Sequence, residues 1–292
     1  MRITQSETYR NFISDLATLN DAYNKVSRQV SSGKSLNQLS DSPAGSADLL
    51  PLTDLAADID QYRSSADTVS YFLGSADSAL NEVNNIFTSI FSKGSEAASE
   101  IVGDDARATL AMEIRSLRDQ ILSLANSQVK GRYLFAGSLV ASAPFVLEGD
   151  SVRYVGDDDI NSVYVEEGTE VKTGVTGAET FSSIFSSIAS LLSAMESNDT
   201  SAIGAALNQF KSAFSELGQA RGKIGSSMNL IQDVQTRLDG QETNLKARRS
   251  KIEDADIAQA VVQLSQTKTA LQTAISAGGS ILQQRNLFDI LG

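Results

Sequence analysis

The stretch LTDLAADIDQYRSSADTVSYFLGSADSALNEVNNIFTSI, residues 52–90, decides the fold class of this chain. Apolar residues recur through it in alternating steps of three and four, at Leu52, Leu55, Ile59, Tyr62, Ala66, Val69, Leu73, Ala76, Leu80, Val83, Phe87 and Ile90. This spacing places them along one side of an α-helix, about 60 Å long, that packs lengthwise against another helix. One heptad fits any amphipathic helix, but an unbroken row of this length favours rod-like helices packed side by side.

Other parts of the chain show the same spacing. Near the start, one row comprises Tyr9, Phe12, Leu16, Leu19, Tyr23, Val26 and Val30. In the C-terminal part, apolar residues recur every seven positions at Ile203, Phe210, Leu217, Ile224, Ile231, Leu238, Leu245 and Ile252. The phase then shifts, and the row continues through Ile257, Val261, Leu264, Leu271, Ile275 and Leu282, interrupted at one core position by Lys268. These rows predict a mainly α protein built as a long antiparallel helical rod that resembles a coiled-coil bundle.

The core of this rod is expected where the first stretch meets the C-terminal heptads. Its predicted members are Leu52, Leu55, Ile59, Tyr62, Val69, Leu73, Leu80, Val83, Phe87, Ile90, Ile224, Ile231, Leu238, Leu245 and Ile252. Between the N-terminal row and this stretch lie Gly33, Pro43, Gly45 and Pro51 with several Ser and Asp residues. Such residues interrupt helices, so a connector with turns is expected from residue 33 to Pro51.

The middle of the chain has a different pattern. Short β-type runs occur at 145–147, 152–155 and 163–165, separated by turns rich in Gly and Asp. They predict a small antiparallel β insert at about 138–178, followed by a helix over 182–195. The expected organisation is terminal helices with their connector (1–49 and 253–292), a helical rod domain (50–137 and 198–252) and an outer insert (138–197).

Composition excludes many kinds of function. The 292 residues include no Cys and no His, which removes Ser–His–Asp triads, Cys–His sites and zinc fingers. A net charge of −12 argues against binding to nucleic acid or to an anionic membrane surface. The polar start contains no apolar segment typical of a cleaved signal peptide, and no apolar run is long enough to predict a transmembrane helix.

Three short motifs have possible chemical meanings, and each has a more ordinary explanation. Asp157-x-Asp159-x-Asn161 begins like a calcium loop, but Ser162 and Gly168 stand where such a loop needs Gly and Glu. Residues 218–224 resemble a phosphate loop with one residue too few between the glycines. The basic cluster Lys246, Arg248, Arg249 and Lys251 is balanced by nearby acids, which favours a solvated helix face. We therefore expect no catalytic residue, no cofactor and no metal.

Motifs near both ends carry a family resemblance. Residues 30–34, Val-Ser-Ser-Gly-Lys, followed by Ser40-Asp41-Ser42-Pro43-Ala44-Gly45, resemble the turn after the first helix of bacterial flagellins. Residues 250–257, Ser-Lys-Ile-Glu-Asp-Ala-Asp-Ile, resemble the C-terminal signature of that family. Residues 79–85, Ala-Leu-Asn-Glu-Val-Asn-Asn, are similar to its rod helix. The resemblance covers about 1–137 and 200–292.

Within this family, the chain is most similar to the branch that forms the junction between hook and filament. The start Met-Arg-Ile-Thr, the proline of Asp41-Ser42-Pro43 and residues 131–138, Gly-Arg-Tyr-Leu-Phe-Ala-Gly-Ser, are of that type. The resemblance implies an extracellular, non-enzymatic structural protein exported by the flagellar type III apparatus without a cleaved signal. It also implies that the terminal helices assemble with other copies, the N-terminal row and the row from Ile257 to Leu282 forming the assembly seams.

The same resemblance implies several partners. These are other copies in a ring-like homo-oligomer, the hook-side junction protein, filament flagellin, and a cytoplasmic export chaperone bound to the C-terminal segment, with no nucleic acid and no membrane. Two alternatives stay open at this point. The chain could be a filament flagellin itself, or a coiled-coil protein similar to a type III secretion tip.

Overall fold

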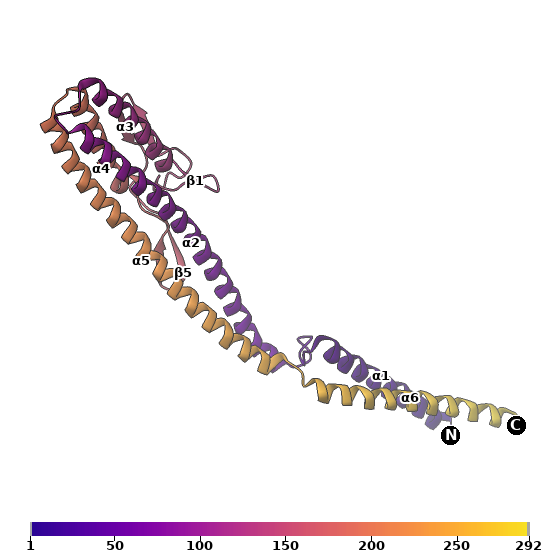
Figure 1. The fold of residues 1–292 in the computed structure, drawn as a ribbon. Helices are drawn as coiled ribbons and strands as arrows, with labels where there is room; N and C mark the ends of the chain where they lie inside the picture. Colours follow the sequence, from indigo (N-terminus) through magenta and orange to yellow (C-terminus); the bar gives the residue numbers. More distant parts are fainter. Residues whose placement is uncertain (1, 291–292) are drawn as a thin grey trace. The chain divides into compact units, whose positions relative to one another are not determined.

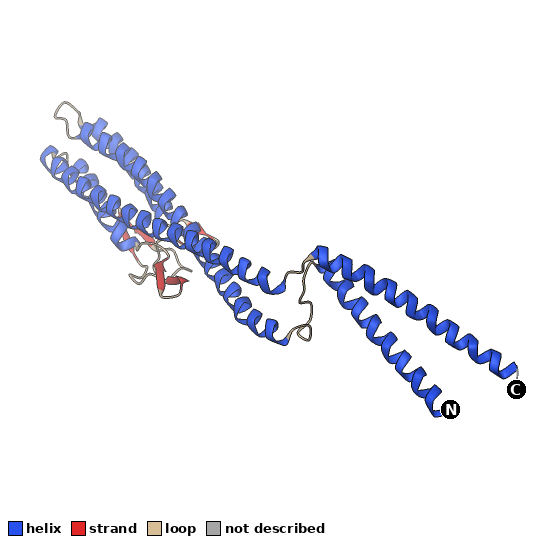
Figure 2. Ribbon diagram, turned by 90° about the horizontal axis from the view of Figure 1, so that it is seen from below, coloured by secondary structure: helices blue, strands red, loops and turns tan. Residues whose placement is uncertain are grey.

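The computed structural model describes the backbone of residues 2–290 and the side chains of residue 7 and residues 9–280. Long helices make up most of it: α1 (Arg2–Ser32), α2 (Pro43–Ala97), α3 (Asp104–Ala125), α4 (Gly177–Glu196), α5 (Thr200–Glu253) and α6 (Ile257–Ile290). Short antiparallel hairpins lie between α3 and α4 in the sequence. Figure 2 shows how strongly helix predominates over strand. The predicted mainly α fold with a small β-rich insert is confirmed.

The hairpins are made of strand pairs joined by tight turns. β1 (Gln128–Val129) pairs with β2 (Arg132–Tyr133), β3 (Phe145–Glu148) with β4 (Ser151–Tyr154), and β5 (Ser162–Glu166) with β6 (Thr169–Lys172). Gly149 and Gly168, in the turns of the second and third hairpins, both have positive φ. This conformation is accessible to glycine at little cost, which explains why the Gly-rich breaks in the sequence become hairpin turns.

Two helix starts differ from the sequence expectation. α2 begins at Pro43, so the connector covers about 33–42 and does not extend to Pro51. Proline suits the first turn of a helix because the N–H that it lacks has no intrahelical partner there. α4 begins at Gly177, earlier than residue 182, because the hydroxyl of Thr176 accepts a hydrogen bond from the backbone N–H of Glu179 and so caps the helix.

The chain forms two compact units, which we call the terminal unit (residues 1–58 and 241–292) and the central unit (59–240). The expected boundaries after residues 49 and 252 fall inside the terminal unit, because α2 and α5 run through both. Residues 138–197 lie within the central unit. The division into three parts stays a prediction.

Within the central unit, α2 and α5 run antiparallel and side by side (Figure 1). Their contacts pair rising numbers on α2 with falling numbers on α5: Arg63 with Asp239 (2.5 Å), Asp67 with Gln235 (2.8 Å), Asp77 with Arg221 (2.9 Å), and Phe87 stacked on Phe210 with ring centroids 3.7 Å apart. Apolar residues fill the space between α2 and α5 along the rows of polar contacts. The predicted lengthwise helix packing thus extends over most of both helices within this unit.

Most of the predicted rod core is buried. The buried members are Ile59, Val69, Leu73, Leu80, Val83, Phe87, Ile90, Ile224, Ile231, Leu238 and Leu245. Leu52, Tyr62 and Ile252 are half-buried. Leu55 differs from the expectation, because its side chain is 45% exposed. Periodicity identifies the side of α2 on which Leu55 lies, but it does not say whether another helix covers that side so near the helix start.

An aromatic cluster joins the hairpins to α4 within the central unit. The ring of Phe181 on α4 is fully buried and lies 4.9 Å from that of Phe135 and 5.6 Å from that of Phe145, measured between centroids. Tyr154 packs against Phe145, and its hydroxyl donates a 2.7 Å hydrogen bond to the carbonyl of Asp157. Burial, with the nearby charge of Asp158, raises the pKa of Tyr154 to about 12. The strands and α4 therefore share one core.

Candidate assembly surface of the terminal helices

In the terminal unit, α1 packs along α6. The row on α1 contributes one buried residue, Val26, and the half-buried Phe12, Leu16, Leu19, Tyr23 and Val30, whereas Tyr9 is 52% exposed. The ring of Phe12 lies so close to Gly278 that a Cβ atom at 278 would collide with it. Glycine at 278 therefore lets the two helices approach closely at this point.

The residues of α6 that face α1 are not the ones that the sequence spacing predicted. The covered residues are Ala260, Leu264, Thr267, Leu271, Ala274 and Gly278. Of the predicted seam, Leu264 and Leu271 are half-buried, but Ile257, Val261 and Ile275 are 43%, 48% and 57% exposed. The side chain of Leu282 lies outside the described residues.

The physical reason for this difference is that two rows overlap on α6. Both follow steps of three and four residues, and both contain Leu264 and Leu271. The row with small residues allows α1 to pack closely, whereas the row with β-branched residues does not. Periodicity favours both rows equally, so the size of the side chains decides between them.

The sides of α6 that α1 does not cover are almost uncharged. Between Asp256 and Arg285 its one charged residue is Lys268. Exposed apolar side chains on this surface include Val262, which is 58% exposed, together with Ile257, Val261 and Ile275. A solvent-facing helix surface normally carries several charges, so this composition is typical of a helix that is covered on more than one side.

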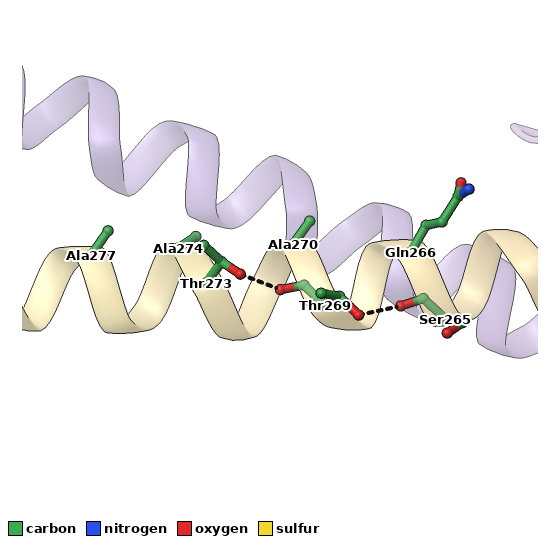
Figure 3. A pocket seen from close by; sticks show the side chains of 7 residues that line it. All are labelled: Ser265, Gln266, Thr269, Ala270, Thr273, Ala274 and Ala277. Atoms are coloured by element: carbon green, nitrogen blue, oxygen red, sulfur yellow. Dashed lines mark hydrogen bonds between the residues drawn. The ribbon is translucent and has the colours of Figure 1, made fainter.

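A groove of about 690 Å³ runs along α6 next to the side that α1 covers, and it shares Ala274 with that side (Figure 3). It is lined by Ser265, Gln266, Thr269, Ala270, Thr273, Ala274 and Ala277. The hydroxyls of Thr269 and Thr273 donate hydrogen bonds to the carbonyls of Ser265 and Thr269 on their own helix. These hydroxyls are thus already engaged, and the groove has small, mainly apolar walls. It suits the side of another helix better than a polar small molecule.

The motifs quoted from the two ends of the sequence meet in space. The backbone N–H of Ser35 donates to the carbonyl of Glu253 (2.6 Å), and that of Ala255 donates to the carbonyl of Gly33 (2.9 Å). The ammonium of Lys34 lies 3.3 Å from the carboxylate of Glu253. The connector and the break between α5 and α6 thereby satisfy each other's backbone groups at the helix ends. Sequence reasoning missed this contact, because nothing in the spacing shows that residues 33–35 and 252–255 pair.

Asp41 organises the connector itself. Its side chain is 8% exposed and accepts hydrogen bonds from the backbone N–H groups of Asn37 (3.1 Å) and Gln38 (3.0 Å), with Lys25 3.4 Å away. Burial by itself would raise the pKa of Asp41, but these N–H groups and the Lys25 ammonium outweigh it. The pKa of Asp41 therefore lies below its usual value of 3.8.

Replacing Asp41 with Asn should destabilise the terminal unit by about 1 kcal/mol at pH 7, because the charged acceptor of two N–H groups is lost. A lowered carboxyl pKa contributes stability that is fully present above the usual value of 3.8 and is lost as the pH falls through the lower folded value. The difference from the parent should therefore disappear in strong acid. Thermal unfolding at pH 7 and pH 2.5 checks this, with the exposed Asp54→Asn as control. A difference of the same size at both pH values would contradict it.

The motifs with possible chemical meanings have structural partners. Asp157 accepts a hydrogen bond from the Ser138 hydroxyl. Lys223 of the glycine-containing stretch pairs with Glu179 on α4. In the basic cluster, Lys246 lies 2.5 Å from the carboxylate of Glu242. Among the side chains that the structure describes, no group of three or more His, Cys, Asp or Glu residues is placed to hold a metal ion. No helix of the described part is long and apolar enough to cross a membrane.

Comparison with known proteins gives matches at both ends and over the whole length. Residues 4–139 match the bacterial flagellin N-terminal helical region, and residues 203–291 match the bacterial flagellin C-terminal helical region. Flagellar hook-associated protein 3 of Salmonella typhimurium is 24% identical over 98% of this chain and 100% of its own length. Flagellin of Bacillus subtilis is 25% identical over 98% of this chain and 96% of its own.

A solved structure shares the fold. The flagellar junction protein FlgL of Legionella pneumophila has a TM-score of 0.60 at 14% identity, covering 70% of this chain and 99% of its own. The two family regions together include both terminal helices and the long helices of the central unit. The chain belongs to the bacterial flagellin family.

Proposed function

We propose that this chain is a structural subunit of the bacterial flagellum that forms the junction between hook and filament. In this proposal it assembles with copies of itself through its terminal helices and catalyses no reaction. The similarity to flagellar hook-associated protein 3 extends over almost the entire chain, which supports a place at the junction. The residues of the two predicted seams would then contribute to the assembly surface.

One observation carries the proposal. The surface of α6 has a single charge between Asp256 and Arg285, yet Ile257, Val261, Val262 and Ile275 are exposed on it. Exposed apolar residues that lie along one helix favour association, because covering them removes apolar area from water. Since α1 already covers the small-residue side of α6, the remaining sides are available to helices of other subunits. Such repeated head-to-tail contacts build rings and tubes.

The proposal includes an extracellular location after export without a cleaved signal peptide. It also includes contacts with the hook-side junction protein on one side and with filament flagellin on the other. An export chaperone would cover the C-terminal segment before secretion. In this segment, Ile275 is an exposed apolar residue whose side chain the structure describes. The further apolar residues of the segment, from Ile281 to Leu291, lie outside the described side chains.

The second candidate function is that of a filament flagellin. The full-length similarity to the flagellin of Bacillus subtilis supports it. Both candidates belong to one structural class and differ in position along the flagellum. A type III secretion tip protein is less well supported, because flagellin-type regions match at both ends of this chain.

Labelling of isolated flagella separates the two candidates. The chain has no cysteine, so Glu167→Cys in the exposed turn between β5 and β6 provides a single site for a gold label. Electron micrographs should show gold confined to a short zone where the hook meets the filament, and the cysteine-free parent should stay unlabelled. Gold along the whole filament would establish the flagellin alternative. Flagella without label would contradict both.

A further inference from the structure

α6 has a second apolar row beside the one that α1 covers. Ile257, Val261, Leu264, Lys268, Leu271 and Ile275 follow each other in steps of four and three residues. Leu264 and Leu271 lie at the border with α1 and are half-buried, whereas the other four residues are exposed. This spacing is that of a seam for another helix laid lengthwise along α6. In the described part of the chain, no helix lies on it.

Lys268 is the exception within this row. It is the one charged residue between Asp256 and Arg285, and among the described side chains it has no ion pair or hydrogen-bond partner. If a helix covers the row, the ammonium group of Lys268 leaves water. An unpaired buried charge is costly, so the covering helix must supply a carboxylate. A single charged residue at a core position of a helix seam also determines the register, because other registers leave it unpaired.

The carboxylate cannot come from a second α6, which carries none between Asp256 and Asp289. On α1, Asp21 is exposed and is two residues from both Leu19 and Tyr23, which face α6. At 100° per residue, Asp21 lies on the side of α1 turned away from α6. Asp21 has no ion-pair partner among the described side chains. Ile13 lies about two helical turns before Asp21 on α1, and its side chain is 47% exposed.

We propose that Lys268 of one copy pairs with Asp21 on α1 of a neighbouring copy and sets the register in which the terminal helices assemble. This inference rests on the proposed function and specifies its contact. The spacing supports it: Ile13 is eight residues from Asp21, and both Val261 and Ile275 are seven residues from Lys268. When the charges meet, the exposed Ile13 therefore lies level with an exposed apolar residue of the second row, whichever way the helices run. The contact is heterologous, so each copy offers both halves.

Charge reversal tests this pairing in the full chain, expressed in its own bacterium in place of the parent. Lys268→Glu and Asp21→Lys should each lower the amount of chain recovered in isolated flagella by about tenfold or more. The double variant, which restores opposite charges, should recover to within about twofold of the parent. Lys268→Arg should assemble normally. Lys172→Glu, the same reversal on an exposed residue of β6, is the matched control and should have no effect.

Each outcome distinguishes the pairing from the proposed function. Parent chain at the junction together with normal assembly of Lys268→Glu would overturn the pairing and leave the function intact. Parent chain absent from flagella would overturn both. Asp15 is another exposed carboxylate on α1. If Lys268→Glu loses assembly and Asp15→Lys restores it, whereas Asp21→Lys does not, the choice of Asp21 would be overturned.

A folding defect is excluded by a second measurement. Thermal unfolding of purified Lys268→Glu should match the parent, because residue 268 is exposed. In the cysteine-free chain, the variant Lys268→Cys/Asp21→Cys should be cross-linked between copies by a short bismaleimide in isolated flagella. Cross-linking that occurs only within one chain, or none at all, would overturn the pairing.

Discussion

Replacing Phe181 with Ala should lower the free energy of unfolding of the central unit by about 3–5 kcal/mol. The Phe181 side chain is 0% exposed, and its ring lies within 6.2 Å, centroid to centroid, of the rings of Phe135, Phe145 and Phe185. Truncation removes these contacts and leaves a cavity that the surrounding strands and α4 can fill only in part. Equilibrium denaturation of the full chain, followed by circular dichroism, measures the loss.

The matched control is Phe214→Ala on α5. Phe214 is 41% exposed, although its ring lies 4.7 Å from that of Phe87, so its loss should cost about 1 kcal/mol. The same experiment tests whether the hairpins unfold separately from α4. Since Phe145 lies on β3 and Phe181 on α4, and their rings are in contact, we expect one transition for residues 59–240. A separate early transition of the hairpins would show that the shared core is weaker than its geometry implies.

Replacing Arg107 with Ala should cost about 3 kcal/mol. The Arg107 guanidinium is buried and donates hydrogen bonds to the carbonyls of Ala97 (3.1 Å) and Val102 (3.0 Å) and to Oδ1 of Asn198 (2.9 Å). It thus joins the end of α2 and the loop after it to the turn between α4 and α5. Removing the side chain leaves these acceptors without a donor in a region that water reaches poorly.

Two variants show whether the forked geometry of Arg107 matters. Arg107→Lys would keep the charge but place all the donors on one nitrogen, so about half of the loss should remain. Arg153→Ala removes an exposed arginine whose partner is the exposed Glu148, and it should cost much less than Arg107→Ala because water screens this pair. Equal losses for Arg107→Ala and Arg153→Ala in chemical denaturation would refute the role of the buried network.

Neither Phe181 nor Arg107 could be selected from the sequence. The spacing of Phe181 is that of an ordinary helix residue, and only the fold brings Phe135 and Phe145 to it. Arg107 belongs to a helix whose other polar residues are mostly exposed, and its acceptors lie in two separate turns. Such contacts join residues that are far apart in the sequence, and they depend on where the turns place the helices and strands. The spacing of apolar residues along the sequence does not predict which distant residues meet.

The sequence by itself determined the class of the fold and most of the long helices, because an apolar row with steps of three and four residues can be buried only as one side of a helix. It also determined the family, through motifs near both ends. Only the tertiary structure decided that those motifs pair through Ser35 and Glu253, and which row of α6 faces α1. Two rows share Leu264 and Leu271 and have the same period. The choice between them depends on side-chain volume at a close helix contact, where Gly278 fits beneath Phe12 and a β-branched residue does not.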